Sequence, residues 1–512
     1  MSSTPRSPRS ATSTLRLVAP GAWVALVACG AVAPSVEPAR PSATPLPSGS
    51  APASDASRGA PPAPPIAAPT SLAPAASSAA AAPSAPPASL LVTARWLPIH
   101  ERPDRGSPRV GLSRRGQRVP LSSAARATHP SSPCRGGWYA VAPRGFACAG
   151  ADATLGEDRG AEAAAALLPD ASRSLPFRVG AASFGPRYRR PPTAGEQAVT
   201  ELDLTKLTRT AQAEPPLIDP SALAALRGRE PRLLFARGTY ASERVAWARE
   251  LAGDGRAFVV TPDGAILPKD RVTPLDEPPA FGADLAAPGA SKLPVALVVT
   301  EDARRLEVEG DHLVEREPLA RRSVIPVDGG PVTTLGVRLL RARGGGWVRA
   351  SDVAWAEAPA SLPVGVGPDA RWVRASVGRG TLLAMRGLTP VRVFAMSPGA
   401  GGVGQGVTHG TPLGRFMVSW KHLTADMSGE EGGVRWSVDE VPWVAYYLDG
   451  YAVHGAYWHD GFGRPRSHGC LNLTPADARW LFGWMDPQLP EGWYAVAAHP
   501  TLRPATIIDV AP

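Results

Sequence analysis

Two histidines and one cysteine near the end of the chain have the types and spacing that covalent catalysis needs. His454 is followed by a glycine, and the run 467–472 (SHGCLN) then brings His468 and Cys470 close together in sequence. A thiol becomes a strong nucleophile when a neighbouring imidazole takes its proton. Backbone N–H groups in a glycine-containing loop can stabilise the oxyanion of an acyl-transfer intermediate. These residues therefore predict a cysteine acyltransferase or peptidase.

A metal site is the competing interpretation of the same region. Imidazole and thiolate groups both bind zinc, and a zinc hydrolase would also need a carboxylate base, for which Asp460 is the nearby candidate. The candidate ligands are His454, His459, His468 and Cys470. Their spacing matches no established zinc motif. We therefore predict no metal and assign the chemistry to the thiol.

The N-terminal part has the composition of an export signal followed by a tether. Residues 1–28 contain an arginine-rich start and a short apolar stretch that ends in Leu-Val-Ala before Cys29. This ending resembles the lipobox of bacterial lipoproteins, in which the cysteine is lipidated; an ordinary signal peptide is the alternative. Residues 29–89 are rich in Ala, Pro and Ser and cannot bury enough apolar surface to fold. We expect a lipid-anchored protein of the cell envelope that faces the periplasm, and Gly30 after the cysteine favours the outer membrane.

The other cysteines differ in their surroundings. Cys134 and Cys148 lie close together in a segment that carries Trp and Tyr, which favours a disulfide between them in an exported protein. Cys470 is then left over. A thiol in an oxidising compartment is expected to be kept for its reactivity. This count marks Cys470 independently of its neighbours.

The catalytic candidates lie between predicted strands and a predicted helix. Strand-like runs occur at 372–377, 391–396, 443–448 and 451–455. Asp449-Gly450 favours a hairpin turn between the last two. Thr474, Pro475 and Asp477 are typical of a helix start. The apolar stripe of this helix is Ala478, Leu481, Phe482 and Met485. The loop that holds Cys470 is thus expected between a sheet and a helix.

The middle of the chain is predicted to form small β units. Short alternating segments separated by Gly and Pro predict a compact barrel at 90–150, similar to bacterial SH3-like domains. A second small β domain is expected at 256–357, and 151–255 would connect the two. Short helices are expected at Ala161–Leu168 and Ser221–Leu226. Such units either bind wall peptides or act as spacers, and no binding motif decides between these roles.

The composition restricts the classes of function. A chain of 512 residues suggests about three folded units at roughly 150 residues each. The 54 Lys and Arg against 45 Asp and Glu give a net charge of +9, but the basic residues are scattered arginines without a basic face. We therefore predict no nucleic-acid partner. No apolar run approaches the ~20 residues of a spanning helix, which excludes a multi-span membrane protein.

The motif residues resemble the signature of the YkuD-type L,D-transpeptidases. The family pattern is His-Gly, then after a short interval Ser/Thr-His-Gly-Cys, an apolar residue and Asn or Arg, as at His454-Gly455 and 467–472. Upstream, the run 411–416 (TPLGRF) resembles the family's Thr-Pro-x-Gly-x-Phe segment. The resemblance covers about residues 368–500, which leaves 501–512 as a C-terminal tail. One departure is 378–380 (GRG), where many members have a Gln before a strand.

The resemblance implies a role for each matched residue. Cys470 would attack the carbonyl of the third stem-peptide residue, a diamino acid, and expel the terminal D-Ala. His454 would take the thiol proton and later handle the proton of the acceptor amine, with the Gly455 carbonyl orienting its ring. His468 and the backbone N–H groups of Gly469 and Cys470 would line the oxyanion side. The amine of a second stem peptide would resolve the acyl-enzyme into a 3→3 cross-link, and no cofactor is implied.

Further residues near the motif are assigned to substrate binding or to structure. The predicted substrate contacts are Ser467, Asn472, Arg464, Arg466 and Trp458. The arginines, with Arg435, suit bidentate recognition of carboxylates, although solvated surface charge is an equal alternative. We expect His459 in a surface loop, and His409 and His422 to be structural.

The predicted fold is mainly β, with small SH3-like barrels before an L,D-transpeptidase-type sheet domain that has a short helix after the cysteine loop. Three function classes remain open. The first is a transpeptidase that acts on peptidoglycan stem peptides. The second is an L,D-carboxypeptidase or endopeptidase that uses the same site with water as the acceptor. The third is a non-catalytic, lipid-anchored protein that binds peptidoglycan, against which the intact His454, His468 and Cys470 argue.

Overall fold

The structure is a computed structural model that describes residues 88–127, 134–198, 200–201, 239, 243–404, 408–431, 434–499 and 505–512. The predicted signal segment, the lipidation site Cys29 and all but the last residues of the tether lie outside the described residues, as does the helix expected at Ser221–Leu226. In the described ranges, no helix is both long and apolar enough to cross a membrane.

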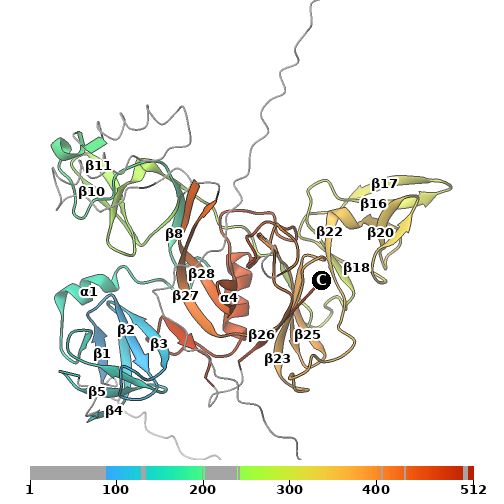
Figure 1. The fold of residues 1–512 in the computed structure, drawn as a ribbon. Coiled ribbons are helices and arrows are strands. Elements are labelled where there is room, and N and C mark those ends of the chain that lie inside the picture. The colour runs from blue at the N-terminus through green and yellow to red at the C-terminus, as the bar shows by residue number, and fades with distance from the viewer. Residues whose placement is uncertain are drawn as a thin grey trace, which may run out of the picture.

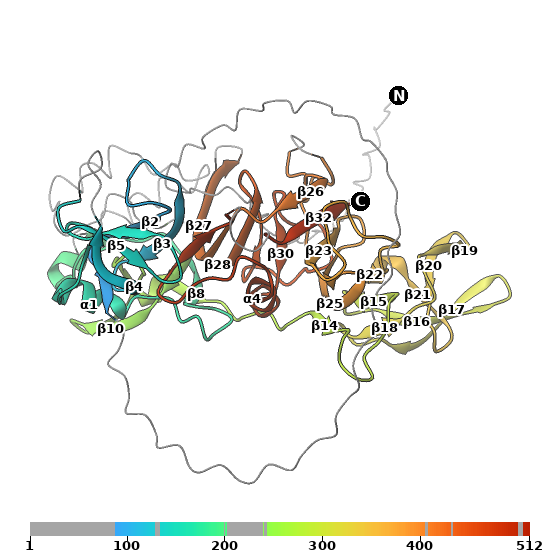
Figure 2. The same cartoon turned by 90° about the horizontal axis from the view of Figure 1, so that it is seen from below.

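Four β-rich units make up the described chain (Figure 1). We call residues 89–165 the first unit, 171–275 the second unit, 293–357 the third unit, and 368–512 with the segment 280–284 the C-terminal unit. The first and second units lie on one side of the C-terminal unit and the third unit lies on the other, and the view from below shows the same arrangement (Figure 2). The C-terminal unit therefore contacts accessory units on both flanks.

The first unit is built from seven short strands and covers the range for which a small β domain is predicted. Its strands are β1 (Ser89–Val92), β2 (Trp96–His100), β3 (Arg109–Arg114), β4 (Arg118–Ala127), β5 (Trp138–Val141), β6 (Phe146–Cys148) and β7 (Ala153–Thr154). Helix α1 (Arg159–Ala165) follows, with Asp158 as its N-cap, close to the predicted helix. Cys134 and Cys148 form the predicted disulfide, with Cα atoms 5.8 Å apart. Strand β3 pairs with a strand of the C-terminal unit, so the two units share a sheet.

The second unit contains six strands, and its extent differs from the prediction. The strands are β8 (Arg178–Ala182), β9 (Arg244–Trp247), β10 (Arg249–Gly253), β11 (Arg256–Val260), β12 (Ile266–Pro268) and β13 (Val272–Pro274). Strand β11 pairs with β10 on one side and β12 on the other. The predicted domain boundary at 256 therefore falls inside a sheet, because β10, one of the two pairing partners of β11, lies upstream of it.

The third unit forms two small sheets. The first is β18 (Val324–Pro326), β15 (Val295–Val298) and β22 (Val353–Ala356). The second is β17 (His312–Pro318), β16 (Arg304–Glu309), β21 (Trp347–Arg349), β20 (Val337–Arg341) and β19 (Val332–Thr334). This second sheet projects away from the rest of the molecule (Figure 2). Ion pairs between Arg and Glu side chains lie on this sheet, as expected for a solvated surface.

The C-terminal unit packs two sheets and one helix around a common core. One sheet contains β27 (Trp420–Glu431), β28 (Val434–Leu448), β29 (Tyr451–Gly455), β30 (Leu471–Leu473) and β31 (Ala495–Ala497). The other has the order β14 (Gly282–Asp284), β25 (Thr389–Ala395), β24 (Thr381–Arg386), β23 (Arg371–Ser376), β32 (Ile507–Ala511) and β26 (Gly414–Met417). Buried apolar residues from both sheets, including Phe394, Val453 and Ile508, form one cluster between them. The strands and the hairpin turn at 449–450 predicted from the sequence are present.

Helix α4 (Pro475–Trp484) begins where the sequence predicts it. Thr474 caps it through its hydroxyl, which accepts the Asp477 N–H at 3.2 Å. The predicted stripe of Ala478, Leu481, Phe482 and Met485 is buried in the core. At the other end of the helix, the fully buried Lys421 donates to three carbonyls, those of Phe482 at 2.6 Å, Met485 at 2.7 Å and Pro487 at 2.8 Å. An ammonium group at this end satisfies carbonyls that the helix leaves open.

The segment predicted as a C-terminal tail is part of the sheet. Strand β32 pairs in parallel with β23 and antiparallel with β26, so it lies inside the six-stranded sheet. Ile508 and Val510 alternate into the core. The prediction of a tail at 501–512 is therefore wrong for residues 507–511, because the pattern of this short strand gives no indication of its two distant partners.

Candidate active site

The strand register brings the two predicted catalytic residues to the same face of one sheet. Strands β29 and β30 are parallel, and His454 lies opposite Asn472. Side chains that lie opposite each other point to the same face, and so do residues two apart along a strand. Cys470 directly precedes β30, two residues before Asn472. The imidazole and the thiol are therefore presented on one face of the sheet from neighbouring strands.

The ring of His454 is held by a backbone carbonyl. Its Nδ1 lies 3.0 Å from the Gly455 oxygen. A carbonyl can only accept a hydrogen bond, so Nδ1 carries the proton and the lone pair is on Nε2. The predicted orienting role of the Gly455 carbonyl agrees with this contact. Trp458 stands beside the imidazole, with ring centroids 5.9 Å apart.

The cysteine loop is cross-linked by two buried hydroxyl groups. Ser467 Oγ accepts the Gly469 N–H at 3.0 Å and donates to the Cys470 carbonyl at 2.6 Å. Thr411 Oγ1 accepts the Gly399 N–H at 2.8 Å and donates to the Gly469 carbonyl at 3.1 Å. Ser467 and Thr411 are each fully buried. These bonds fix the backbone on which Cys470 sits.

Two predicted roles change as a result. Ser467 was predicted to bind substrate, but its hydroxyl is used inside the loop and positions the nucleophile instead. The Gly469 N–H was predicted to face the oxyanion, but it points to Ser467 Oγ. The predicted oxyanion role of the Cys470 N–H stays a prediction. The sequence could not show this, because a serine near a cysteine fits a substrate contact and a loop bridge equally well.

Asn472 and His459 form a part-buried contact next to His454. Asn472 is 1% exposed and its side-chain amide lies 3.2 Å from His459 Nε2. The Gly461 N–H points to Nδ1 of this ring at 3.3 Å, so Nδ1 accepts and Nε2 carries the proton. The amide must then present its oxygen to Nε2, which also satisfies the otherwise unpaired Oδ1. Asn472 was predicted to contact substrate, but its amide bonds to His459 instead. His459 lies in a loop, as predicted, and its ring is half-buried rather than on the surface.

His468 lies in an aromatic wall together with residues that the sequence reasoning did not assign to the site. The rings of His409 and His468 meet edge to face with centroids 3.7 Å apart. Trp436 stacks on His468, with ring centroids 6.0 Å apart. Thr411 could have been found from the TPLGRF segment, whereas nothing near His409 or Trp436 in sequence indicates the site.

Two of the three arginines considered as substrate contacts bond to other parts of the chain in the structure. Arg464 is half-buried and donates to the Val353 carbonyl of the third unit at 3.4 Å, so it belongs to an interface between units. Arg435 is exposed and pairs with Glu430 at the tip of the β27–β28 hairpin. Arg466 packs against Gly461, and its substrate contact stays a prediction.

Asp460, the candidate base of a zinc hydrolase, is held by arginines. Arg321 contacts its carboxylate at 2.8 Å and Arg322 at 2.6 Å, both from the third unit. Within the described ranges, no three His, Cys, Asp or Glu side chains come together as a metal site would require.

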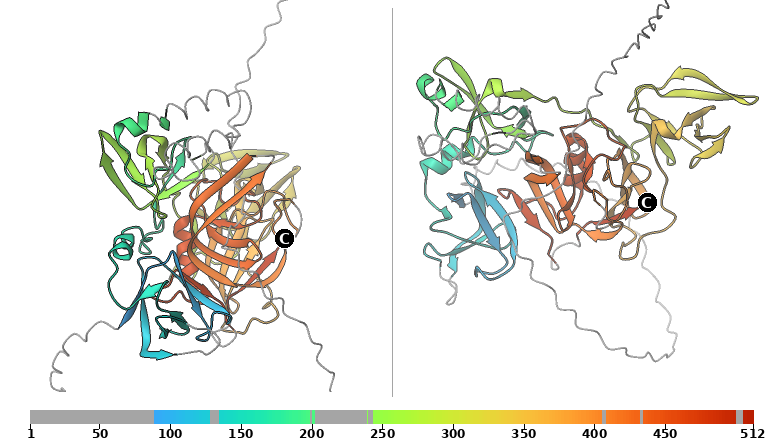
Figure 3. Two further views of the ribbon diagram at one scale, coloured as in Figure 1. Left: turned by 60° about the vertical axis from the view of Figure 1, so that its left-hand side comes forward. Right: turned by 45° about the horizontal axis from the view of Figure 1, so that its top comes forward.

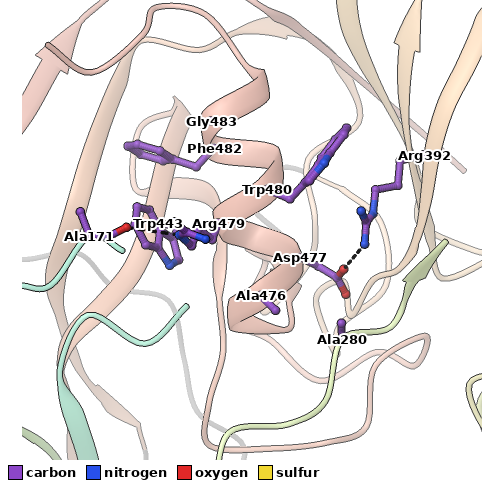
Figure 4. A pocket seen from close by; sticks show the side chains of 10 residues that line it. All are labelled: Ala171, Ala280, Arg392, Trp443, Ala476, Asp477, Arg479, Trp480, Phe482 and Gly483. Atoms are coloured by element: carbon purple, nitrogen blue, oxygen red, sulfur yellow. Dashed lines mark hydrogen bonds and ion pairs between the residues drawn. The ribbon is translucent and has the colours of Figure 1, made fainter. Parts of the chain in front are cut away.

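A cavity of about 430 Å³ lies elsewhere in the C-terminal unit (Figure 4). It opens along α4, and Trp443, Trp480 and Arg479 are among its lining residues. Asp477 and Arg392 face each other across one end of it, 3.5 Å apart. Neither Cys470 nor His454 lines this cavity. Both residues are 0% exposed, so the reaction centre is closed in this structure.

Comparison with known proteins gives a family for this part of the chain. Residues 370–496 match the YkuD family model, described as the L,D-transpeptidase catalytic domain. The C-terminal unit thus carries a YkuD-type L,D-transpeptidase catalytic domain, as the motif predicts. No curated protein matches the chain.

Several solved structures are similar to this chain over part of its length. The L,D-transpeptidase of Xylanimonas cellulosilytica is 24% identical, with a TM-score of 0.20, over 29% of this chain and 64% of its own. The E. faecium L,D-transpeptidase catalytic domain is 18% identical, with a TM-score of 0.20, over 28% of this chain and 97% of its own. The LD transpeptidase LdtMt1 in complex with imipenem is 18% identical, with a TM-score of 0.21, over 42% of this chain and 82% of its own.

Proposed function

We propose that the protein is a peptidoglycan L,D-transpeptidase that forms 3→3 cross-links through a thioester on Cys470. The observation that carries this proposal is the pairing of His454 with Asn472, which puts the imidazole and the thiol on one face of the sheet. The family match of residues 370–496 supports the same reaction class. The Gly455 carbonyl leaves the basic lone pair of His454 on Nε2, as a proton acceptor needs.

The proposed reaction has two halves. In the first, His454 Nε2 takes the proton of the Cys470 thiol, and the sulfur attacks the carbonyl of the third stem residue. The peptide C–N bond breaks, the imidazolium returns the proton to the departing D-Ala amine, and a thioester remains. In the second, the side-chain amine of another stem attacks the thioester, His454 takes its proton, and the thiolate leaves. One amide is broken and one is formed, so no outside energy source is needed.

Hydrolysis of the same thioester by water is the alternative. The closed site favours transfer, because Cys470 and His454 are shielded from bulk water in this structure. The buried loop hydroxyls also hold the nucleophile in place, which argues against a non-catalytic domain. We further propose, from the sequence, that Cys29 carries a lipid and that the chain acts in the cell envelope on stem peptides.

The test uses purified tetrapeptide muropeptides and a carbapenem. The wild-type protein should release D-Ala and form dimers joined through two diamino acids, as read by mass spectrometry. Imipenem should acylate Cys470, as a matched L,D-transpeptidase was solved in complex with this compound. Cys470→Ala should lose both reactions and Arg190→Gln, at an exposed ion pair with Glu196 in the second unit, should keep both. Release of D-Ala with only tripeptides would identify a hydrolase, and a full adduct on Cys470→Ala would exclude this nucleophile.

A further inference from the structure

The closed site raises the question of how substrate reaches the thiol. Cys470 and His454 are each 0% exposed. Acylation requires a substrate carbonyl in van der Waals contact with sulfur, so a wall of the site must move before the reaction. Two segments are candidates for this movement. We call residues 427–431 and 434–439 of the β27–β28 hairpin the hairpin wall, and residues 456–466 the loop wall.

The two walls are joined by one buried hydrogen bond. Tyr457 of the loop wall donates its hydroxyl to the Asp439 carbonyl of the hairpin wall at 3.0 Å. Tyr457 is 2% exposed. It belongs to the same apolar cluster as Cys470, Met427 and Trp436. This bond must break if the walls separate.

The second unit holds the hairpin wall from outside. Arg187 donates to Asp439 at 3.1 Å and to Glu243 at 3.0 Å, and Ser437 of the hairpin wall donates to Glu243 at 3.0 Å. Strand β9 lies beside β28, with Arg244 opposite Val438. Figure 3 shows the second unit beside the β27–β28 hairpin in both views. The tie therefore combines a buried ion pair with strand pairing.

The arginine of this tie is charged and almost fully enclosed. Its side chain is 8% exposed, and that of Glu243 is 0% exposed. Burial acts to lower the pKa of Arg187, but the charges of Asp439, Glu243 and Asp263 outweigh it and raise that pKa above its ordinary value. Buried ion pairs contribute little net stability, whereas loss of one partner is costly. The pair therefore fixes the position of the hairpin wall and adds little to the free energy of unfolding.

The second unit also contributes to the apolar cluster that contains Cys470. Leu175, Phe177 and Val179 share the apolar cluster that contains Cys470. Trp443 of β28 donates its indole N–H to the Ser174 carbonyl at 2.5 Å. These contacts come from the segment that leads into β8. An outward movement of the hairpin wall would have to disturb them.

The loop wall is held from the other flank of the C-terminal unit. Arg321 and Arg322 of the third unit pair with Asp460 of the loop wall. His459 adds the part-buried contact to Asn472. The hairpin wall is held by the second unit through Arg187 at Asp439, together with the Ser437–Glu243 bond and the pairing of β28 with β9. Each wall is therefore held by a different accessory unit.

We propose that Arg187 is a positioning residue that holds the hairpin wall closed over Cys470, so that the second unit controls access of the stem peptide to the active site. This inference rests on the acyl-transfer function proposed above. Release of the Arg187–Asp439 pair and of the Tyr457–Asp439 bond exposes the thiol for acylation. Re-formation of both bonds encloses the thioester.

The test measures two quantities separately: the exposure of the thiol and the rate of its acylation. In the full chain, alkylation of Cys470 by iodoacetamide is followed by peptide mass spectrometry, and imipenem acylation is followed by intact mass. Arg187→Gln removes the charge and should raise both second-order rate constants by about tenfold to a hundredfold, as expected for loss of a charge-assisted hydrogen bond. Tyr457→Phe keeps the ring, removes one neutral bond, and should raise them less, by about threefold to tenfold.

Matched controls separate local opening from general loss of stability. Arg190→Gln breaks an exposed ion pair with Glu196 in the second unit and should leave both rates unchanged. Lys421→Met weakens the C-terminal unit away from both walls and should not raise alkylation well below its unfolding temperature. If Arg187→Gln does not fold, Glu243→Gln tests the same tie.

The outcomes distinguish this inference from the proposed function. Wild-type alkylation rates in both Arg187→Gln and Tyr457→Phe would overturn the inference. An equal rise in Lys421→Met would also overturn it, because global unfolding would then explain the exposure. Faster alkylation of Arg187→Gln with no imipenem adduct on any variant would support the closed wall and contradict the acyl-transfer function.

Discussion

Thr411→Val should disturb the active site without touching the nucleophile. The Thr411 hydroxyl is fully buried and bridges the Gly399 N–H at 2.8 Å and the Gly469 carbonyl at 3.1 Å. Valine has nearly the same shape, so the substitution removes the bridge and leaves the packing almost unchanged. Gly469 immediately precedes Cys470 and has a φ of 127°. The bridge therefore holds the backbone conformation on which the thiol depends.

The expected loss of stability follows from the two polar groups that Thr411→Val leaves without a partner, the Gly399 N–H and the Gly469 carbonyl. Each buried polar group that loses its partner costs about 1–3 kcal/mol. Partial relaxation of the loop reduces the sum, so we expect the free energy of unfolding to fall by about 2–4 kcal/mol. A shift of the nucleophile by ~1 Å can cost about a hundredfold in rate. We therefore expect imipenem acylation to slow by about tenfold to a hundredfold.

The assay combines urea unfolding with the rate of imipenem acylation, measured where every variant is folded. Thr411→Ser is the matched control, since it keeps the hydroxyl and loses only a methyl group. It should lose about 1 kcal/mol and acylate close to the wild-type rate. If Thr411→Val acylates as fast as the wild type, the bridge does not position Cys470. If Thr411→Val and Thr411→Ser lose equal stability, the methyl group and not the hydroxyl explains the effect.

Two further predictions concern buried ionisable groups. Lys421→Met leaves three carbonyls near the end of α4 without their donor, so the free energy of unfolding should fall by about 2–4 kcal/mol in urea titrations; a more stable variant would contradict this account. Burial, and then the charges of Arg466 and His454, lower the pKa of His459 to about 3. In the unfolded chain this histidine binds its proton near pH 6.5, whereas in the folded chain it stays neutral until about pH 3. The free energy of unfolding should therefore fall as the pH drops from about 6.5 towards 3, by up to about 1.4 kcal/mol per pH unit. His459→Gln should remove that share of the slope between pH 7 and 4, and an unchanged slope would show that His459 does not cause it.

The local chemistry was predictable because it depends on neighbours in sequence. Thr474, Pro475 and Asp477 cap α4 as expected, since capping involves groups a few residues apart. The pairing of Cys134 with Cys148 was likewise predictable in a short, cysteine-poor segment. Cys470 and His454 stood out by residue type and spacing, and the strand register presents them on one face.

The roles of the residues around the nucleophile were less predictable. Ser467, Asn472 and Arg464 were expected to contact substrate, yet they bond to the loop, to His459 and to the third unit. A polar side chain next to a motif satisfies its hydrogen bonds wherever the fold offers a partner. That partner is often distant in sequence, so the motif alone cannot name it.

The sequence by itself determined the reactive group, the capped helix behind it and the succession of short strands, because residue type, alternation and capping act over a few residues. Only the tertiary structure decided that residues 507–511 form an inner strand, that β11 belongs with β10, and that Arg187 reaches Asp439. These contacts join segments far apart in the chain. Many arginines could have met many carboxylates, and only the packing of the units selects the pair.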